Sequence, residues 1–219
     1  MWALVWKDLV LELRRRDTVT SMVLFGVATL LVLRFSLDMN TSTAMHLAPG
    51  ILWLAILFSA TTAMGRTFVI ERDSGCMNAL LMAPIDRGRI FLGKLVVNFA
   101  LLVAFEAVLV PAFFLFFEVP EQTRTGALIG LLLAGNLGIA ASGTLFALAA
   151  LGTRARELVL PLLVVPLQVP LLLAAVESTA IVMGGGGLAD IGRWAQVLVA
   201  FDVLFVTTGW LAFEFLAVD

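Results

Sequence analysis

The sequence predicts an all-α integral membrane protein. Hydrophobic residues make up 61% of its 219 residues and charged residues only 14%, whereas charged residues are about a quarter of an ordinary soluble domain. Mean hydropathy is +1.06, and six apolar stretches approach or exceed the roughly 20 residues that a helix needs to cross the hydrocarbon core. No stretch between them reaches about 50 residues, the lower size of a domain, so no separate catalytic domain is expected.

Residues 1–17 predict an amphipathic helix that lies in the membrane interface. One stripe of the helix is apolar and includes Trp2, Val5, Trp6, Leu9 and Leu13. The other face is charged and carries Asp8, Glu12, Arg15 and Arg16. A signal peptide is the alternative, but no small-x-small cleavage motif ends the apolar run that follows.

The six predicted membrane spans form a single domain over residues 1–219. They cover residues 19–37, 47–69, 90–117, 126–151, 158–183 and 194–218. Of the 14 Lys and Arg residues, eleven lie in the N-terminal segment and in the loops after the second and fourth spans, and three lie on the other side. Because positive residues concentrate on the cytoplasmic side, both termini and the loop after the second span are expected in the cytoplasm.

Small residues recur every fourth position along the fourth span: Gly126, Gly130, Ala134, Gly138 and Ser142. Such a stripe lets helix backbones approach closely. We expect a contact with another helix of the same chain, and a contact between subunits is the alternative.

Residues 66–94 form the longest polar interruption of the chain, and we expect another protein to act on the membrane part here. Residues 88–94 partly match a phosphate-binding loop, but Leu95 stands where a Ser or Thr hydroxyl must reach Mg²⁺. The segment also leads directly into a span. Arg89 and Lys94 are therefore expected to anchor the third span at the inner interface, and ATP binding by this chain is not expected.

Two acids stand out within the spans as candidate functional residues, Glu106 in the third and Glu177 near the outer end of the fifth. His46 is a candidate haem contact, although a single interfacial histidine is usually an anchor. Cys76 is the only cysteine, which excludes an internal disulfide and a cysteine-based metal motif. We predict no catalytic residues, no metal site and no nucleic-acid binding, and we expect contact with membrane lipids.

Several features together resemble the membrane subunits of type-2 ABC exporters. They are the amphipathic N-terminal helix, the six spans, the sequence Glu-Arg-Asp-Ser-Gly at 71–75, and the Pro84 and Gly93-Lys94 that follow it. Two segments are similar, more narrowly, to the CcmB family, the haem exporter protein B proteins of cytochrome c maturation. These are His-Leu-Ala-Pro-Gly-Ile-Leu-Trp-Leu-Ala at 46–55 and Leu-Pro-Leu-Leu-Val-Val-Pro-Leu-Gln-Val-Pro-Leu-Leu at 160–172.

The resemblance implies a non-catalytic permease in the bacterial inner membrane that pairs with the ATPase subunit CcmA in a two-plus-two complex, in which this chain is a homodimer. It also implies work with the haem-handling protein CcmC and the haem chaperone CcmE. ATP and Mg²⁺ would then be bound by the ATPase subunit and haem by partner proteins, with no cofactor bound directly by this chain. The implied activity is haem export or release of the haem-loaded chaperone.

The resemblance further implies that residues 71–83 form a cytoplasmic coupling helix between the second and third spans. Asp73 or Ser74 would cap its start, and Pro84 would end it. Its apolar ridge would comprise Met77, Leu80 and Leu81, and its charges Glu71, Arg72 and Asp73 would pair with the ATPase. The alternative is a solvated loop beside the membrane.

Two other functions fit the same composition. One is an ABC permease for a lipid, polysaccharide or drug. The other is a proton-coupled carrier that uses Glu106 and Glu177, although such carriers usually contain internal repeats with broken helices.

Overall fold

The structure, a computed structural model, describes residues 2–15, 17–36, 41–68, 75, 86–150, 156–187 and 189–216. Within these residues the chain forms seven helices and no strand. The helices are α1 (Trp2–Arg15), α2 (Asp17–Ser36), α3 (Thr41–Met64), α6 (Arg87–Phe116), α7 (Thr125–Ala149), α8 (Arg156–Met183) and α9 (Gly192–Leu216). The predicted all-α class is confirmed.

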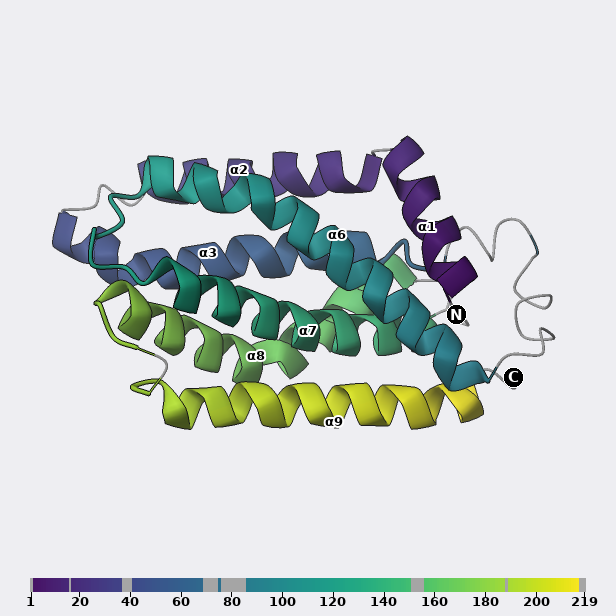
Figure 1. The fold of residues 1–219 in the computed structure, drawn as a ribbon. Helices are drawn as coiled ribbons and strands as arrows, with labels where there is room; N and C mark the ends of the chain where they lie inside the picture. Colours follow the sequence, from purple (N-terminus) through teal and green to yellow (C-terminus); the bar gives the residue numbers. More distant parts are fainter. Residues whose placement is uncertain are drawn as a thin grey trace.

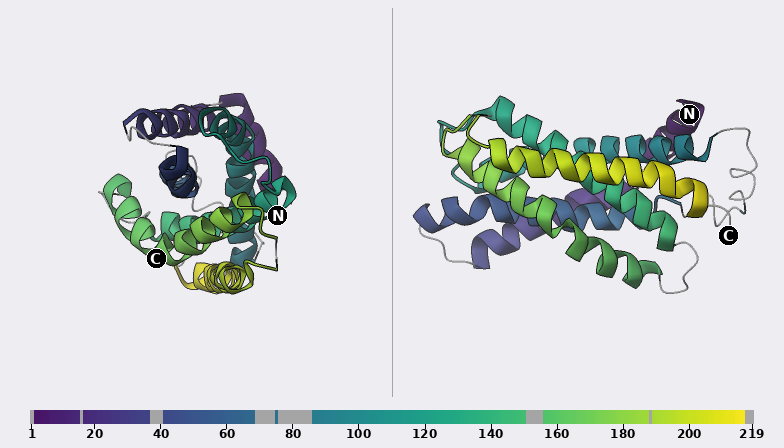
Figure 2. Two further views of the ribbon diagram at one scale, coloured as in Figure 1. Left: turned by 90° about the vertical axis from the view of Figure 1, so that its left-hand side faces the viewer. Right: turned by 90° about the horizontal axis from the view of Figure 1, so that it is seen from below.

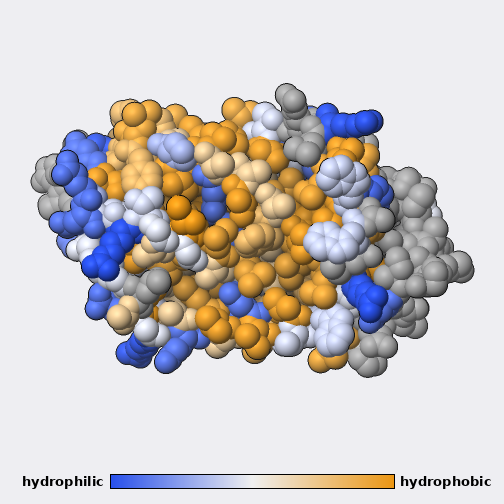
Figure 3. All heavy atoms as spheres, in the orientation of Figure 1, coloured by the Kyte–Doolittle hydropathy of each residue, from blue (hydrophilic) through white to orange (hydrophobic). Residues whose placement is uncertain are grey.

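Six of the described helices, α2 to α9, are long and apolar enough to cross a membrane. They run side by side as a bundle, with α9 on one face (Figures 1 and 2). Hydrophobic residues cover the middle of the face shown in Figure 3, and hydrophilic residues gather toward its two ends. This distribution matches the apolar core and polar borders of a bilayer.

Helix α7 is the centre of the bundle and contacts α3, α6, α8 and α9. In its apolar segment 78% of the residues are buried, against 28% in α9. Small residues make this burial possible, because a Cβ atom at Gly135 would collide with the ring of Trp53 and one at Gly143 with the side chain of Met64. Neighbouring side chains therefore pack directly on the α7 backbone.

The predicted stripe of small residues on α7 divides into two parts. Gly138 and Ser142 are buried, and a Cβ atom at Gly138 would lie 2.9 Å from a methyl carbon of Leu171 on α8. At Gly126 and Gly130 a Cβ atom would meet nothing within 4 Å. The expected contact within the chain thus holds for the second half of the stripe only.

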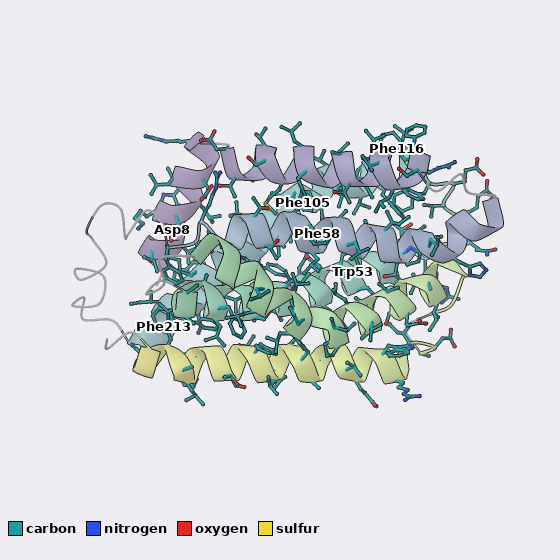
Figure 4. The ribbon with its side chains drawn as sticks, turned by 180° about the vertical axis from the view of Figure 1, so that it is seen from behind. Asp8, Trp53, Phe58, Phe105, Phe116 and Phe213 are labelled. Atoms are coloured by element: carbon teal, nitrogen blue, oxygen red, sulfur yellow. The ribbon has the colours of Figure 1, made fainter. Side chains whose placement is uncertain are left out.

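Helix α1 lies across one end of the bundle, where the C-terminal ends of α3 and α9 and the start of α6 also lie (Figure 1). We call this the α1 end. Trp2 and Trp6 are 75% and 72% exposed, whereas Val5 and Asp8 are buried. Asp8, predicted on the charged face of this helix, is buried because α1 rests on α6 with the side that carries Val5 and Asp8 (Figure 4).

Candidate functional site

The α1 end contains a buried ion pair that joins two helices. The Lys94 ammonium on α6 lies 2.8 Å from the Asp8 carboxylate on α1, and both side chains are less than a tenth exposed. Lys94 also donates a hydrogen bond of 3.1 Å to the backbone carbonyl of Thr67, just after α3. The Lys94 ammonium is thus held inside the protein by these two partners, and its expected role as an anchor of the third span stays a prediction.

Asn98, one turn further along α6, extends this cluster to α7. Its amide donates to the hydroxyl of Thr67 at 3.1 Å and to the hydroxyl of Thr144 at 2.8 Å. Asn98 and Thr144 are both buried. The five residues Asp8, Thr67, Lys94, Asn98 and Thr144, which we call the α1-end cluster, therefore connect α1, the end of α3, α6 and α7.

Aromatic packing completes the same end of the bundle. The ring of Phe68 lies 6.2 Å from that of Phe213 on α9, which lies 6.2 Å from that of Phe91 on α6. The Lys94 ammonium sits 5.4 Å from the centre of the Phe68 ring, within the range of a cation–π contact. On the other flank, Asp86 caps α6 by accepting a 2.9 Å hydrogen bond from the Gly88 amide.

Residues 67, 68 and 86 are the described neighbours of the segment predicted to receive a partner. The predicted coupling residues themselves lie outside the described residues: Glu71, Arg72, Asp73, Met77, Leu80 and Leu81. The α1-end cluster nevertheless shows how the chain is fixed on the α3 side of that segment. Thr67 is held through both its hydroxyl and its carbonyl, and Phe68 is fully buried.

The candidate acids and the histidine lie in different settings. Glu106 on α6 is 6% exposed, and its carboxylate accepts a 2.8 Å hydrogen bond from the Asn136 amide on α7. Glu177 is exposed near the end of α8, and His46 is exposed near the start of α3. The structure does not bring these three residues together in one described site. Glu106 joins two helices, as a polar packing residue does.

Asp202 on α9 is a buried acid that the sequence reasoning missed. It is 7% exposed, and its Oδ1 is buried without a hydrogen-bond partner. The signal was present, because an acid inside an apolar span is a functional candidate by default, and Asp202 lies within the predicted span 194–218. Asp202 lines a groove of about 440 Å³ together with apolar residues of α6 and α7, including Phe99 and Ala134.

Among the described residues, no three His, Cys, Asp or Glu side chains are grouped so that they could hold a metal ion. The polar residues that are brought together join helices to one another. The arrangement can hold the bundle together and pass movement from one helix to the next. It defines a multi-pass α-helical membrane protein whose helices are joined by buried polar contacts.

Comparison with known proteins identifies the family. The family model described as CcmB protein matches residues 1–217, so the chain belongs to the CcmB family. It is 28% identical over 178 residues to heme exporter protein B of Paracoccus denitrificans, a match that covers 81% of each chain.

Two further relatives carry the same name. The identity is 26% over 189 residues to heme exporter protein B of Rhodobacter capsulatus, covering 86% of this chain and 85% of the relative. It is 24% over 212 residues to that of Bradyrhizobium diazoefficiens, covering 94% and 92%. The family resemblance drawn from the sequence is confirmed.

Proposed function

We propose that this chain is the membrane subunit of an ABC complex for cytochrome c maturation in the bacterial inner membrane. It couples ATP hydrolysis by a separate subunit to haem export or to release of the haem-loaded chaperone. The observation that carries this proposal is the match of the CcmB family over residues 1–217, shared with relatives named heme exporter protein B. ATP and Mg²⁺ are assigned to the CcmA subunit, and haem to CcmC and CcmE.

In this proposal the α1 end faces the cytoplasm, the side on which the ATPase subunit binds. The support is the distribution of Lys and Arg, most of which lie in the N-terminal segment and in the loops after the second and fourth predicted spans. Residues 71–83 of the loop after α3 act as the coupling helix. Met77, Leu80 and Leu81 provide its apolar contact, and Glu71, Arg72 and Asp73 pair with charges on the ATPase.

The α1-end cluster supports a role in transmission. A displacement of the coupling segment is passed to the bundle through Phe68 and Asp86, the described residues on either side of that segment. Phe68 is fully buried against Phe213 of α9, and Thr67 is hydrogen-bonded to α6 through Lys94 and Asn98. Buried polar networks with satisfied partners are rigid, so a displacement here moves several helices together.

The experiment that tests this function uses the complex purified with its ATPase subunit. Asp73→Lys and Leu80→Asp are expected to abolish stimulation of the ATPase and release of the haem-loaded chaperone, while insertion into the membrane stays intact. Glu121→Lys is the matched control, because Glu121 is exposed in the turn between α6 and α7, at the other end of the bundle. It should behave as wild type.

Wild-type release by both Asp73→Lys and Leu80→Asp would contradict the coupling role. Co-purification tests the class of transporter separately. If the solubilised protein forms its working complex without any ATPase subunit, the ABC proposal is wrong, and a carrier that uses another energy source takes its place.

A further inference from the structure

A groove on the lipid-facing side of the bundle lies between α6, α7 and α9. Its volume is about 440 Å³, and all its lining residues except Asp202 are apolar. The three helices lie on the near face of Figure 1, and the same face in Figure 3 is hydrophobic in its middle. A groove of this kind would normally be filled by lipid tails. Asp202 is the feature that sets it apart.

The carboxylate of Asp202 has no partner within the described part of the chain. A Cβ atom at Gly138 would lie 2.6 Å from its Oδ1, so this oxygen rests against the α7 backbone, and it is buried without a hydrogen bond. An acid at this position within a span is costly and is almost always paired or turned toward the bundle interior. Its Oδ1 is turned toward α7 and finds no donor there, while Asp202 also lines the outward groove. Its partner is therefore expected to come from outside this chain.

We propose that the groove binds a transmembrane helix of another protein, and that this helix carries a cationic or hydrogen-bond-donating side chain at the depth of Asp202. Lipid tails have no donor and cannot pair with the carboxylate. A second copy of this chain is also a poor occupant. A two-fold contact places the same surface patch on both partners, and the lining of this groove offers apolar residues and a second carboxylate but no cation or donor for Asp202.

The surface of α7 beside the groove fits a helix as the occupant. Ala134 lines the groove, and Gly130 and Gly126 continue the same stripe one and two turns further along α7 with nothing within 4 Å of a Cβ atom. Small residues at this spacing allow close approach of two helix backbones. The stripe supplies the packing surface, and Asp202 supplies the specificity. This inference holds whatever the complex transports.

The test uses the full-length protein in phosphatidylcholine vesicles and a synthetic transmembrane peptide rich in Leu and Ala. One version of the peptide has Lys at its centre and the other has Leu, and binding is measured by energy transfer from a labelled protein. The Lys peptide is expected to bind about tenfold more tightly, as interhelical polar contacts in model peptides suggest. Asp202→Leu should remove this preference.

Glu177→Gln is the matched control, because it removes an exposed acid on α8, and it should leave the preference unchanged. Ala134→Leu fills the stripe and should weaken binding of both peptides. If Asp202→Leu fails to insert, Asp202→Asn preserves the shape of the side chain and should reduce the preference at least about threefold.

Equal binding of the two peptides to the wild-type protein would overturn the proposal, as would a preference that survives Asp202→Leu. Energy transfer between two labelled populations of the protein tests the other candidate occupant of the groove, a second copy of this chain. Self-association that Asp202→Leu or Ala134→Leu abolishes would identify a second copy of this chain in the groove, and it would also overturn the proposal.

Discussion

The α1 end and the groove beside α9 differ in whether their buried charges have partners within the chain. At the α1 end, Lys94 lies between the Asp8 carboxylate and the Thr67 carbonyl, and each group has a partner from another part of the chain. In the groove, the Oδ1 of Asp202 has none. The first region is complete within one chain and suits a rigid joint. The second is incomplete, and we infer that another helix completes it.

The largest effect is expected when one member of the pair at the α1 end is removed. Lys94→Met takes the buried cation away from the Asp8 carboxylate and leaves only the half-exposed Lys7 ammonium beside it, and losing one partner of a buried pair costs up to about 3–5 kcal/mol. The free energy of unfolding, measured by SDS titration of the purified protein in mild detergent, should fall by that amount. Lys7→Met is the control. Its ammonium is also 3.0 Å from Asp8, but its side chain is 46% exposed, so the loss should stay below about 1 kcal/mol.

A loss for Lys94→Met as small as that for Lys7→Met would show that the α1 end is not a fixed joint. The contrast with the groove would then disappear.

The next effect concerns packing at two glycines of α7: Gly135, which lies inside the bundle, and Gly130, which lies on the open part of the stripe. Gly135→Ala places a methyl group against the ring of Trp53, which is fully buried and held by a 2.9 Å hydrogen bond to the Thr179 hydroxyl. Overpacking of this kind costs about 1–3 kcal/mol. Gly130→Ala has open space around it and should cost nothing in the isolated protein. The same SDS titration measures both. Equal losses would mean that Gly130 is already covered within the chain.

The smallest effects separate the two acids beside α7. Glu106→Leu leaves the Asn136 amide without its acceptor and should cost about 1–2 kcal/mol. Glu106→Gln keeps an acceptor and should lose less stability and less function. Asp202→Leu removes no described partner and should leave the isolated protein as stable as wild type or more so, since it removes a costly buried acid.

These variants also separate the roles of the acids. Equal loss of function by Glu106→Gln and Glu106→Leu would favour a role for its charge or a proton over hydrogen bonding. A stability loss in Asp202→Leu as large as that in Glu106→Leu would show that Asp202 is paired within the chain.

Much of the fold was predictable because the bilayer sets the length of each span. Hydrophobic stretches of sufficient length define the six membrane-crossing helices without reference to their neighbours. The family was predictable too, since the segments at 46–55 and 160–172 carry specific residues.

The contacts between helices were harder to predict. Helical periodicity shows which residues share a face, but it does not show which helix that face meets. Lys94 beside an apolar run has the pattern of an interfacial anchor, and only the placement of α1 across α6 reveals Asp8 as its partner. Asp202 could have been found from the sequence. Its lack of a partner could not, because this depends on how closely α9 approaches α7 at Gly138.

The most direct test of the central claim, that the α1 end transmits the work of a separate ATPase, is a charge exchange across the Asp8–Lys94 pair. Release of haem-loaded chaperone per ATP hydrolysed is measured in the assembled complex for Asp8→Lys, Lys94→Asp and the double variant. Each single variant places two like charges together and should lose most of the release, whereas the double variant should recover a substantial part of it. Wild-type release per ATP in both single variants would contradict the account.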